Sequence, residues 1–268
     1  MSDGERIVAW IGDWLADGGR LLLMMDYDGT LSPIVPDPAQ AWLPAAVRAN
    51  LRALADRSRI RLAIVSGRDL ADLRRRIGVP EAIYAGCHGL EIVGPDLAFS
   101  HPEAEAQQDS LRAIGLTLRQ RAPAVAGMRV EAKRLGVAVH YRDVAPDQRY
   151  LVDIELARAI RPAGNRLKIF HGSKVIEVLP QVGWNKGQCA RWIRETLQGG
   201  ERRPLLTLYA GDDWTDEHAF EALAGQAITV RVGTLVPATR ARYRLEDVAA
   251  VQGMIAALAA LAEGRGAA

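Results

Sequence analysis

The chain has 268 residues, of which 49% are hydrophobic and 25% are charged; this corresponds to roughly one or two globular domains and excludes a disordered or membrane-spanning chain. A formal net charge of +2 argues against nucleic acid as a partner. Two cysteines, Cys87 and Cys189, are too few for a disulfide framework, although a single bridge between them remains an alternative. The sequence shows no export signal, so the expected location is the cytoplasm.

Three continuous apolar runs predict the central strands, at 21–25, 60–65 and 205–210. Such runs are typical of a parallel sheet that is covered on both faces. Helical patterns fill the intervals, as crossover connections require, at 44–56, 69–77 and 186–197. The sequence therefore predicts an α/β fold with a doubly wound parallel sheet, in which ligands bind beyond the carboxyl ends of the strands.

The first strand ends in Asp26-Tyr27-Asp28-Gly29, which places two carboxylates two residues apart. Asp-Gly is also a common turn, so this segment alone is equally typical of a turn or a helix cap. A turn that contains glycine can, however, aim backbone amides at an anion while the carboxylates hold a cation. Mg²⁺ is the expected cation, because it takes oxygen ligands and pairs carboxylates with phosphate.

The other two strand ends add polar groups to the same predicted crevice. The third strand is followed by the acids Asp212, Asp213 and Asp216, which are also typical of an acid-rich helix N-terminus. Lys186 opens the preceding helix and could balance their charge, although most lysines are merely solvated. Ser66-Gly67-Arg68 offers a hydroxyl and an amide to a phosphate oxygen, although Ser-Gly is also an ordinary loop.

The pattern changes between residues 95 and 182. A helical stretch is followed by two alternating strands, and the same order is then repeated. Gly136 and Gly172 lie where the two hairpins should turn, and Pro95 and Pro180 mark the expected crossings between domains. We expect an inserted second domain at 95–182, between core segments 1–94 and 183–268.

In this order, the segments resemble the motifs of the haloacid dehalogenase superfamily. Within it, the chain is similar to trehalose-6-phosphate phosphatases through "DYDGTLSPI", "IVSGRDL", "AGCHGLEI", "VEAKRLGVAVHYRDV", "GSKVIEVLP", "NKGQCA" and "GDDWTDEHAF". The similarity runs from about Leu21 to Leu245. It implies a Rossmann-like core and an inserted α+β cap, or lid, of two helix-strand-strand repeats. One departure is Cys87, where this family more often has asparagine.

The resemblance also implies residue roles. Asp26 would be the nucleophile that forms an aspartyl-phosphate, Asp28 the general acid and base, and Ser66 and Lys186 the phosphate ligands. The implied Mg²⁺ site is Asp26, Asp212 and Asp28, the last through its backbone carbonyl. The acidic segment after the third strand adds Asp213 and Asp216 to the expected metal ligands.

The substrate implied by the resemblance is a small sugar phosphate, trehalose 6-phosphate, hydrolysed to trehalose and phosphate in the last step of trehalose biosynthesis. Residues expected to bind the substrate are Gly67, Arg68, His88, Glu131, Lys133, His140, Lys174 and Glu177. From pattern alone, the cap residues among them are more typical of the wet face of an open sheet. Alternatives are another sugar phosphatase, of the mannosyl- or glucosyl-phosphoglycerate type, a phosphomutase, or a non-catalytic binding module. The oligomeric state stays open, a monomer included.

Overall fold

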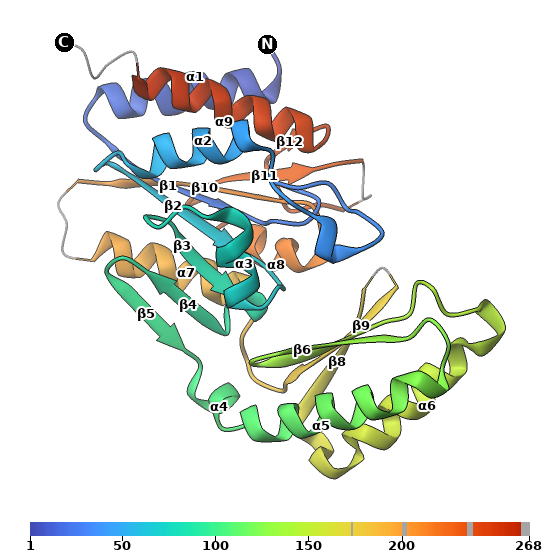
Figure 1. The fold of residues 1–268 in the computed structure, drawn as a ribbon. Helices are drawn as coiled ribbons and strands as arrows, with labels where there is room; N and C mark the ends of the chain where they lie inside the picture. Colours follow the sequence, from blue (N-terminus) through green and yellow to red (C-terminus); the bar gives the residue numbers. More distant parts are fainter. Residues whose placement is uncertain (173, 200–202, 235–237, 264–268) are drawn as a thin grey trace. The chain divides into compact units, whose positions relative to one another are not determined.

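The computed structural model describes residues 1–172, 174–199, 203–234 and 238–263, which form two compact units (Figure 1). The core unit consists of Met1–Phe99 and of the chain from Trp184 onward. The inserted unit consists of Ser100–Gly183. Among the described residues, no helix combines the length and the apolar character needed to cross a membrane.

An eight-stranded sheet with the order β12-β11-β10-β1-β2-β3-β4-β5 forms the centre of the core unit. Its strands are β1 (Arg20–Met25), β2 (Ile60–Val65), β3 (Ile83–Gly86), β4 (Glu91–Gly94), β5 (Leu97–Ser100), β10 (Leu205–Gly211), β11 (Ile228–Val232) and β12 (Tyr243–Leu245). The pairs from β12 to β3 are parallel, and β4 pairs with β3 in antiparallel fashion. The predicted α/β fold with a parallel sheet is confirmed.

Helices cover both faces of this sheet (Figure 1). They are α1 (Asp3–Ala16), α2 (Ala45–Ala55), α3 (Leu70–Ile77), α7 (Lys186–Gln198), α8 (Trp214–Ala222) and α9 (Val248–Glu263). Alternate residues of β1 enter different cores, because successive side chains of a strand point to opposite faces. Leu21 and Leu23 pack with residues of α1, α2 and α9, whereas Leu22 and Met24 pack with residues of α7 and α8. Burial on both faces explains why β1 is apolar from Leu21 to Met25.

The strand register brings the predicted motif ends together at one edge of the sheet. The last residue of β1, Met25, pairs with Ala210 of β10 on one side and with Ile64 of β2 on the other. Val65 of β2 pairs with Ala85 of β3. The loops that follow β1, β2, β3 and β10 therefore start as neighbours.

The inserted unit is a four-stranded antiparallel sheet with two main helices (Figure 1). Its elements are α4 (Pro102–Glu105), α5 (Gln108–Arg121), β6 (Arg129–Lys133), β7 (Gly136–His140), α6 (Arg149–Ile160), β8 (Leu167–Gly172) and β9 (Val175–Pro180), with the sheet order β6-β7-β9-β8. The helix-strand-strand pattern thus occurs twice. Val137, Val139, Ile176 and Val178 pack in one core with residues of α5 and α6, so the alternate residues of β7 and β9 lie on the other face of the sheet.

Two details differ from the sequence-based expectation. Gly94-Pro95 was expected at a domain crossing, but Pro95 lies in the tight turn between β4 and β5, so the chain stays in the core sheet as far as Phe99. The helical stretch of the first repeat is broken at Ala106-Gln107, between α4 and α5. Neither residue is a glycine or proline, so the sequence carried no ordinary signal of this break.

Candidate active site

Asp26 and Lys186 form a buried ion pair at the carboxyl end of β1. Asp26 is the first residue after the strand, and its backbone N–H donates to the carbonyl of Ala210 (2.9 Å). Lys186 opens α7 behind the N-cap Asn185, and its Nζ donates to Asp26 Oδ1 at 2.7 Å. The two side chains are only 6% and 3% exposed, so their attraction is weakly screened by water.

Asp216 is the second partner of this lysine. Lys186 Nζ lies 2.8 Å from Asp216 Oδ1, and the buried hydroxyl of Tyr209 donates to the same oxygen at 2.8 Å. Oδ2 accepts from the backbone N–H of Asp213 (3.1 Å). Asp216 thus holds Lys186 in place and is itself held by three donors, as a fully buried carboxylate requires.

Asp212 completes the cluster through a close approach to Gly29. Thr30 Oγ1 donates to Asp212 Oδ1 at 3.2 Å. Gly29 has a φ of +86°, and a Cβ at this position would lie 2.0 Å from Asp212 Oδ2. Only glycine therefore allows the Asp212 carboxylate to occupy this place beside the turn.

The cluster carries more negative than positive charge. Asp26, Asp212 and Asp216 each offer an oxygen within 4.8 Å of the others, and the positive group paired with Asp26 and Asp216 is the ammonium of Lys186. Burial and repulsion by the neighbouring carboxylates raise the pKa of Asp212 to about 6, and they raise that of Asp26 well above its usual range. Burial opposes the charge of Lys186, but Asp216 and Asp26 outweigh this and raise its pKa. A set of hard oxygen ligands with excess negative charge suits a divalent cation such as Mg²⁺.

The loop after β2 lies next to the turn after β3. Ser66 is buried, and its carbonyl accepts from the backbone N–H of His88 (2.9 Å). The N–H of Cys87 donates to the carbonyl of Arg68 (2.8 Å). A Cβ on Gly67 would lie 2.8 Å from His88 Cε1, so glycine makes room for the imidazole. The structure thus brings together the four residues Ser66, Gly67, Arg68 and His88 predicted to face the substrate.

Cys87 and His88 have φ values of +49° and +59°. Asparagine tolerates this left-handed region better than cysteine does, which gives a physical reason for the asparagine that the resemblance leads one to expect at position 87.

Asp28 lies in a bidentate pair with Arg68. Arg68 Nε donates to Asp28 Oδ2 at 2.6 Å, and Nη2 donates to Oδ1 at 2.7 Å. The Arg68 side chain is 9% exposed and that of Asp28 is 38% exposed. Sequence reasoning placed Arg68 among the substrate ligands and missed this partnership. The pairs Arg68–Asp72 and Asp72–Arg76 were also missed, although each has the i,i+4 spacing that favours an ion pair on a helix.

The Asp213 carboxylate lies outside the cluster formed by Asp26, Asp212 and Asp216. Its exposed carboxylate is the N-cap of α8 and accepts from the backbone N–H of Trp214 (2.7 Å). It also forms a capping box with Asp216. This is the helix-terminus role that the sequence left open for the acidic segment.

The predicted sugar-binding residues of the inserted unit meet on the open face of its sheet. Lys133 of β6 and Glu177 of β9 form an ion pair. His140 Nε2 lies 3.1 Å from Glu131 Oε2. Burial would raise the pKa of Glu131, but the hydrogen bond to His140 and the charge of Lys133 outweigh it and lower the pKa. Lys174 stands at the β8–β9 turn with a φ of +63°, and its carbonyl accepts from the N–H of Tyr141 (3.0 Å).

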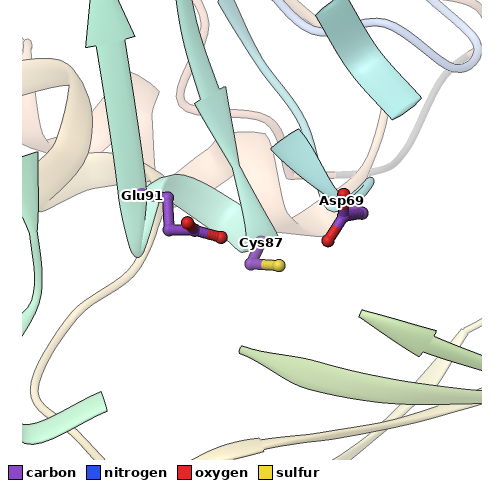
Figure 2. Close-up of side chains that lie close together, drawn as sticks. All are labelled: Asp69, Cys87 and Glu91. Carbon is purple, nitrogen blue, oxygen red and sulfur yellow. The ribbon is translucent and has the colours of Figure 1, made fainter. Parts of the chain in front are cut away.

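A second group of ligand-type side chains lies at the ends of β2 and β3 in the core unit. Figure 2 shows Cys87 between the carboxylates of Asp69 and Glu91. Asp69 is the N-cap of α3, where its side chain accepts from the N–H of Ala71 (3.0 Å). One thiol and two carboxylates do not make the all-oxygen set that Mg²⁺ prefers.

Fold and site together define the class of protein. The first strand of a parallel sheet ends in Asp-x-Asp-Gly, and a buried lysine and a second acidic strand end lie beside it. A separate unit is inserted into this core. These features are those of an α/β protein of the haloacid dehalogenase type.

Comparison with known proteins identifies the family. Residues 24–249 match the model of the trehalose-phosphatase family, and the chain belongs to this family. It is 41% identical over 216 residues to the trehalose-phosphate phosphatase of Mycobacterium marinum, covering 80% of this chain and 54% of that protein. It is 40% identical over 224 residues to that of Mycobacterium tuberculosis, covering 81% and 56%. The chain thus spans about half the length of these relatives.

Solved structures agree with this assignment. The structure of a trehalose-6-phosphate phosphatase related protein has a TM-score of 0.79 and 25% identity, covering 91% of this chain and 99% of that one. Aspergillus fumigatus trehalose-6-phosphate phosphatase has a TM-score of 0.63 and 29% identity, covering 94% and 97%. Membership in this family of phosphatases implies a divalent metal, in agreement with the charge of the cluster.

Proposed function

We propose that this chain is a Mg²⁺-dependent phosphatase that hydrolyses trehalose 6-phosphate to trehalose and inorganic phosphate, in the cytoplasm. The observation that carries the proposal is the buried cluster at the strand ends, in which Lys186 fixes Asp26 beside the acidic pair Asp212 and Asp216. The proposed substrate follows from the similarity to the mycobacterial trehalose-phosphate phosphatases.

Asp26 is the proposed nucleophile. Its Oδ1 is bound by Lys186, which leaves Oδ2 to attack phosphorus. As that bond forms, the bond from phosphorus to the sugar oxygen breaks, and Asp28 gives its proton to this oxygen. In the second step the Asp28 carboxylate takes a proton from water, whose oxygen displaces Asp26 from phosphorus. Splitting the displacement into two steps lets one carboxyl group serve first as acid and then as base.

The remaining core residues bind charge in this proposal. Asp26, Asp212 and the backbone carbonyl of Asp28 would hold Mg²⁺, which would supply positive charge to the phosphate oxygens. Lys186 and Ser66 bind phosphate oxygens. Asp216 accepts three hydrogen bonds already, so its role is to hold Lys186. Asp213 caps α8 and is left out of the metal site.

The inserted unit is the proposed cap, and its open sheet face is the proposed sugar site. Glu131, Lys133, His140 and Glu177 form two charge-assisted pairs there, with Lys174 at the turn beside them. Paired acids and bases can exchange their mutual hydrogen bonds for sugar hydroxyls, whereas a smaller sugar would leave some of them unsatisfied. Discrimination between sugar phosphates is therefore assigned to this face.

The test is phosphate release from trehalose 6-phosphate in the presence of Mg²⁺. Asp26→Asn should abolish it and keep the fold, whereas Asp56→Asn, an exposed aspartate at the end of α2, is the matched control and should keep full activity. Full activity of Asp26→Asn would disprove the nucleophile. A panel with glucose 6-phosphate and glucosyl-phosphoglycerate tests the substrate, and equal rates on all three would leave only a general phosphatase.

A further inference from the structure

A chain of ion pairs runs from the carbonyl groups of one loop to Asp28. It consists of Arg76, Asp72 and Arg68, which follow one another at i,i+4 spacing along and just before α3. Both arginine side chains are buried, 4% and 9% exposed, and Asp72 is 18% exposed. Buried ion pairs are costly to desolvate, so such a chain needs a reason beyond stability.

Arg76 is anchored to the backbone at the far end of this chain. Its Nη1 donates to the carbonyl of Ala41 at 2.9 Å and to that of Ala39 at 3.3 Å. Its guanidinium lies 4.9 Å from the ring centroid of Trp42. Its Nε donates to Asp72 Oδ2 at 2.6 Å. The position of Asp72 is therefore fixed by a group that is itself held by the loop before α2.

The two carboxylate oxygens of Asp72 serve different partners. Oδ2 accepts from both buried arginines, with Arg68 Nη1 at 3.0 Å. Oδ1 accepts from Arg75 Nη2 at 2.5 Å, and the Arg75 side chain is 68% exposed. Arg75 is therefore a natural control residue, because it contacts the same carboxylate but does not connect it to Asp28.

Arg68 is held on three sides before it reaches Asp28. Asp72 binds Nη1, the carbonyl of Pro38 accepts from Nη2 at 3.0 Å, and the ring of Tyr27 lies 5.2 Å from the guanidinium carbon. A guanidinium is planar and rigid, so fixing one edge determines where the other points. That other edge, Nε and Nη2, forms the fork on Asp28.

We propose that Asp72 and Arg76 are positioning residues for the acid–base group: they hold the Arg68 guanidinium, and Arg68 orients the Asp28 carboxylate toward the leaving oxygen and, later, the attacking water. The inference rests on the proposed function, since it takes Asp28 as the acid and base. Loss of Asp72 leaves Asp26 and Lys186 untouched, so the attack on phosphorus persists while the proton transfer is misaligned.

The experiment compares two leaving groups in a single turnover with saturating Mg²⁺. With trehalose 6-phosphate the leaving group is the trehalose alkoxide, which must receive a proton, whereas with p-nitrophenyl phosphate the p-nitrophenolate leaves without one. Asp72→Asn keeps the shape of the side chain and removes its charge, and Arg76→Lys is the second variant. Arg75→Ala is the matched control. Thermal unfolding of each variant shows that the compared proteins are folded.

Asp72→Asn and Arg76→Lys should slow the first turnover of trehalose 6-phosphate about tenfold to a hundredfold, while p-nitrophenol release changes less than about threefold. Arg75→Ala should change both by less than about twofold. A parallel loss on both substrates, or no loss on either, overturns the inference. So does a crystal structure of Asp72→Asn that keeps both Arg68–Asp28 hydrogen bonds. A wild type inactive on every phosphate ester would instead refute the proposed function.

Discussion

Replacing Asp212 with asparagine is expected to stabilise the metal-free protein and to abolish its response to divalent cations. The carboxylate of Asp212 lies beside those of Asp26 and Asp216, and burial with this repulsion raises its pKa to about 6 from 3.8. The folded state thus binds a proton at Asp212 more tightly than the unfolded chain does. Ionisation of Asp212 therefore costs stability above pH 6, and the cost disappears below about pH 4.

The size of the effect follows from the two pKa values. Their difference corresponds to roughly 3 kcal/mol at most, and because Asp212 is only partly buried, solvent screening reduces this to roughly 1 to 2 kcal/mol. Asparagine keeps an oxygen that can accept from Thr30, so the hydrogen bond of the aspartate is not lost with the charge.

The assay is urea unfolding of wild type and Asp212→Asn at pH 7.5 and pH 4.5, with chelator or with Mg²⁺. With chelator, the variant should be more stable at pH 7.5, and its advantage should shrink to roughly a third at pH 4.5. With Mg²⁺, wild type should gain stability and the variant should not. A variant less stable than wild type at pH 7.5 without metal, or an equal difference at both pH values, would refute the electrostatic reasoning.

Three further outcomes test other parts of the structure. Gly29→Ala should weaken Mg²⁺ binding in calorimetric titration by at least about tenfold, because its Cβ would displace the Asp212 carboxylate. The control is Gly225→Ala, with a φ of +71° and nothing within 4 Å of the added Cβ. It should lower the free energy of unfolding by only roughly 1 kcal/mol, through backbone strain. Lys186→Met should lower the free energy of unfolding by about 3 to 5 kcal/mol, since it leaves two buried carboxylates unpaired, and a loss below about 1 kcal/mol contradicts this. Glu177→Gln should raise KM for trehalose 6-phosphate with little change for p-nitrophenyl phosphate, and equal changes would exclude a sugar-binding role.

The central strands were predictable because burial on both faces makes β1, β2 and β10 predominantly apolar. The meeting of Asp26, Ser66 and Asp212 at one edge followed from the parallel arrangement of these strands. Local chemistry and family resemblance together pointed to the residue types of the site.

Pairings between distant segments were not predictable in the same way. The fork between Arg68 and Asp28 joins two loops across the sheet edge, and nothing in either loop alone selects it over a substrate contact. The choice between Asp213 and Asp216 depends on which carboxylate α8 turns toward Lys186, which a run of acids does not show. Gly94-Pro95 was interpreted as a crossing between domains because hairpin turns and domain hinges favour the same residue types.

The pairing of β1 with β10 joins a strand that is synthesised early to one that is synthesised late. Arg20 pairs with Leu205, so the strand that precedes Asp26 is synthesised long before its neighbour β10. At about 5 to 20 residues per second, a ribosome needs roughly 10 to 40 s to cover this interval. The inserted unit, Ser100–Gly183, is contiguous in the chain and is completed within that interval. The inserted unit can therefore fold first, while the apolar edge of β1 is still exposed. We expect chaperones to bind the nascent core during this interval.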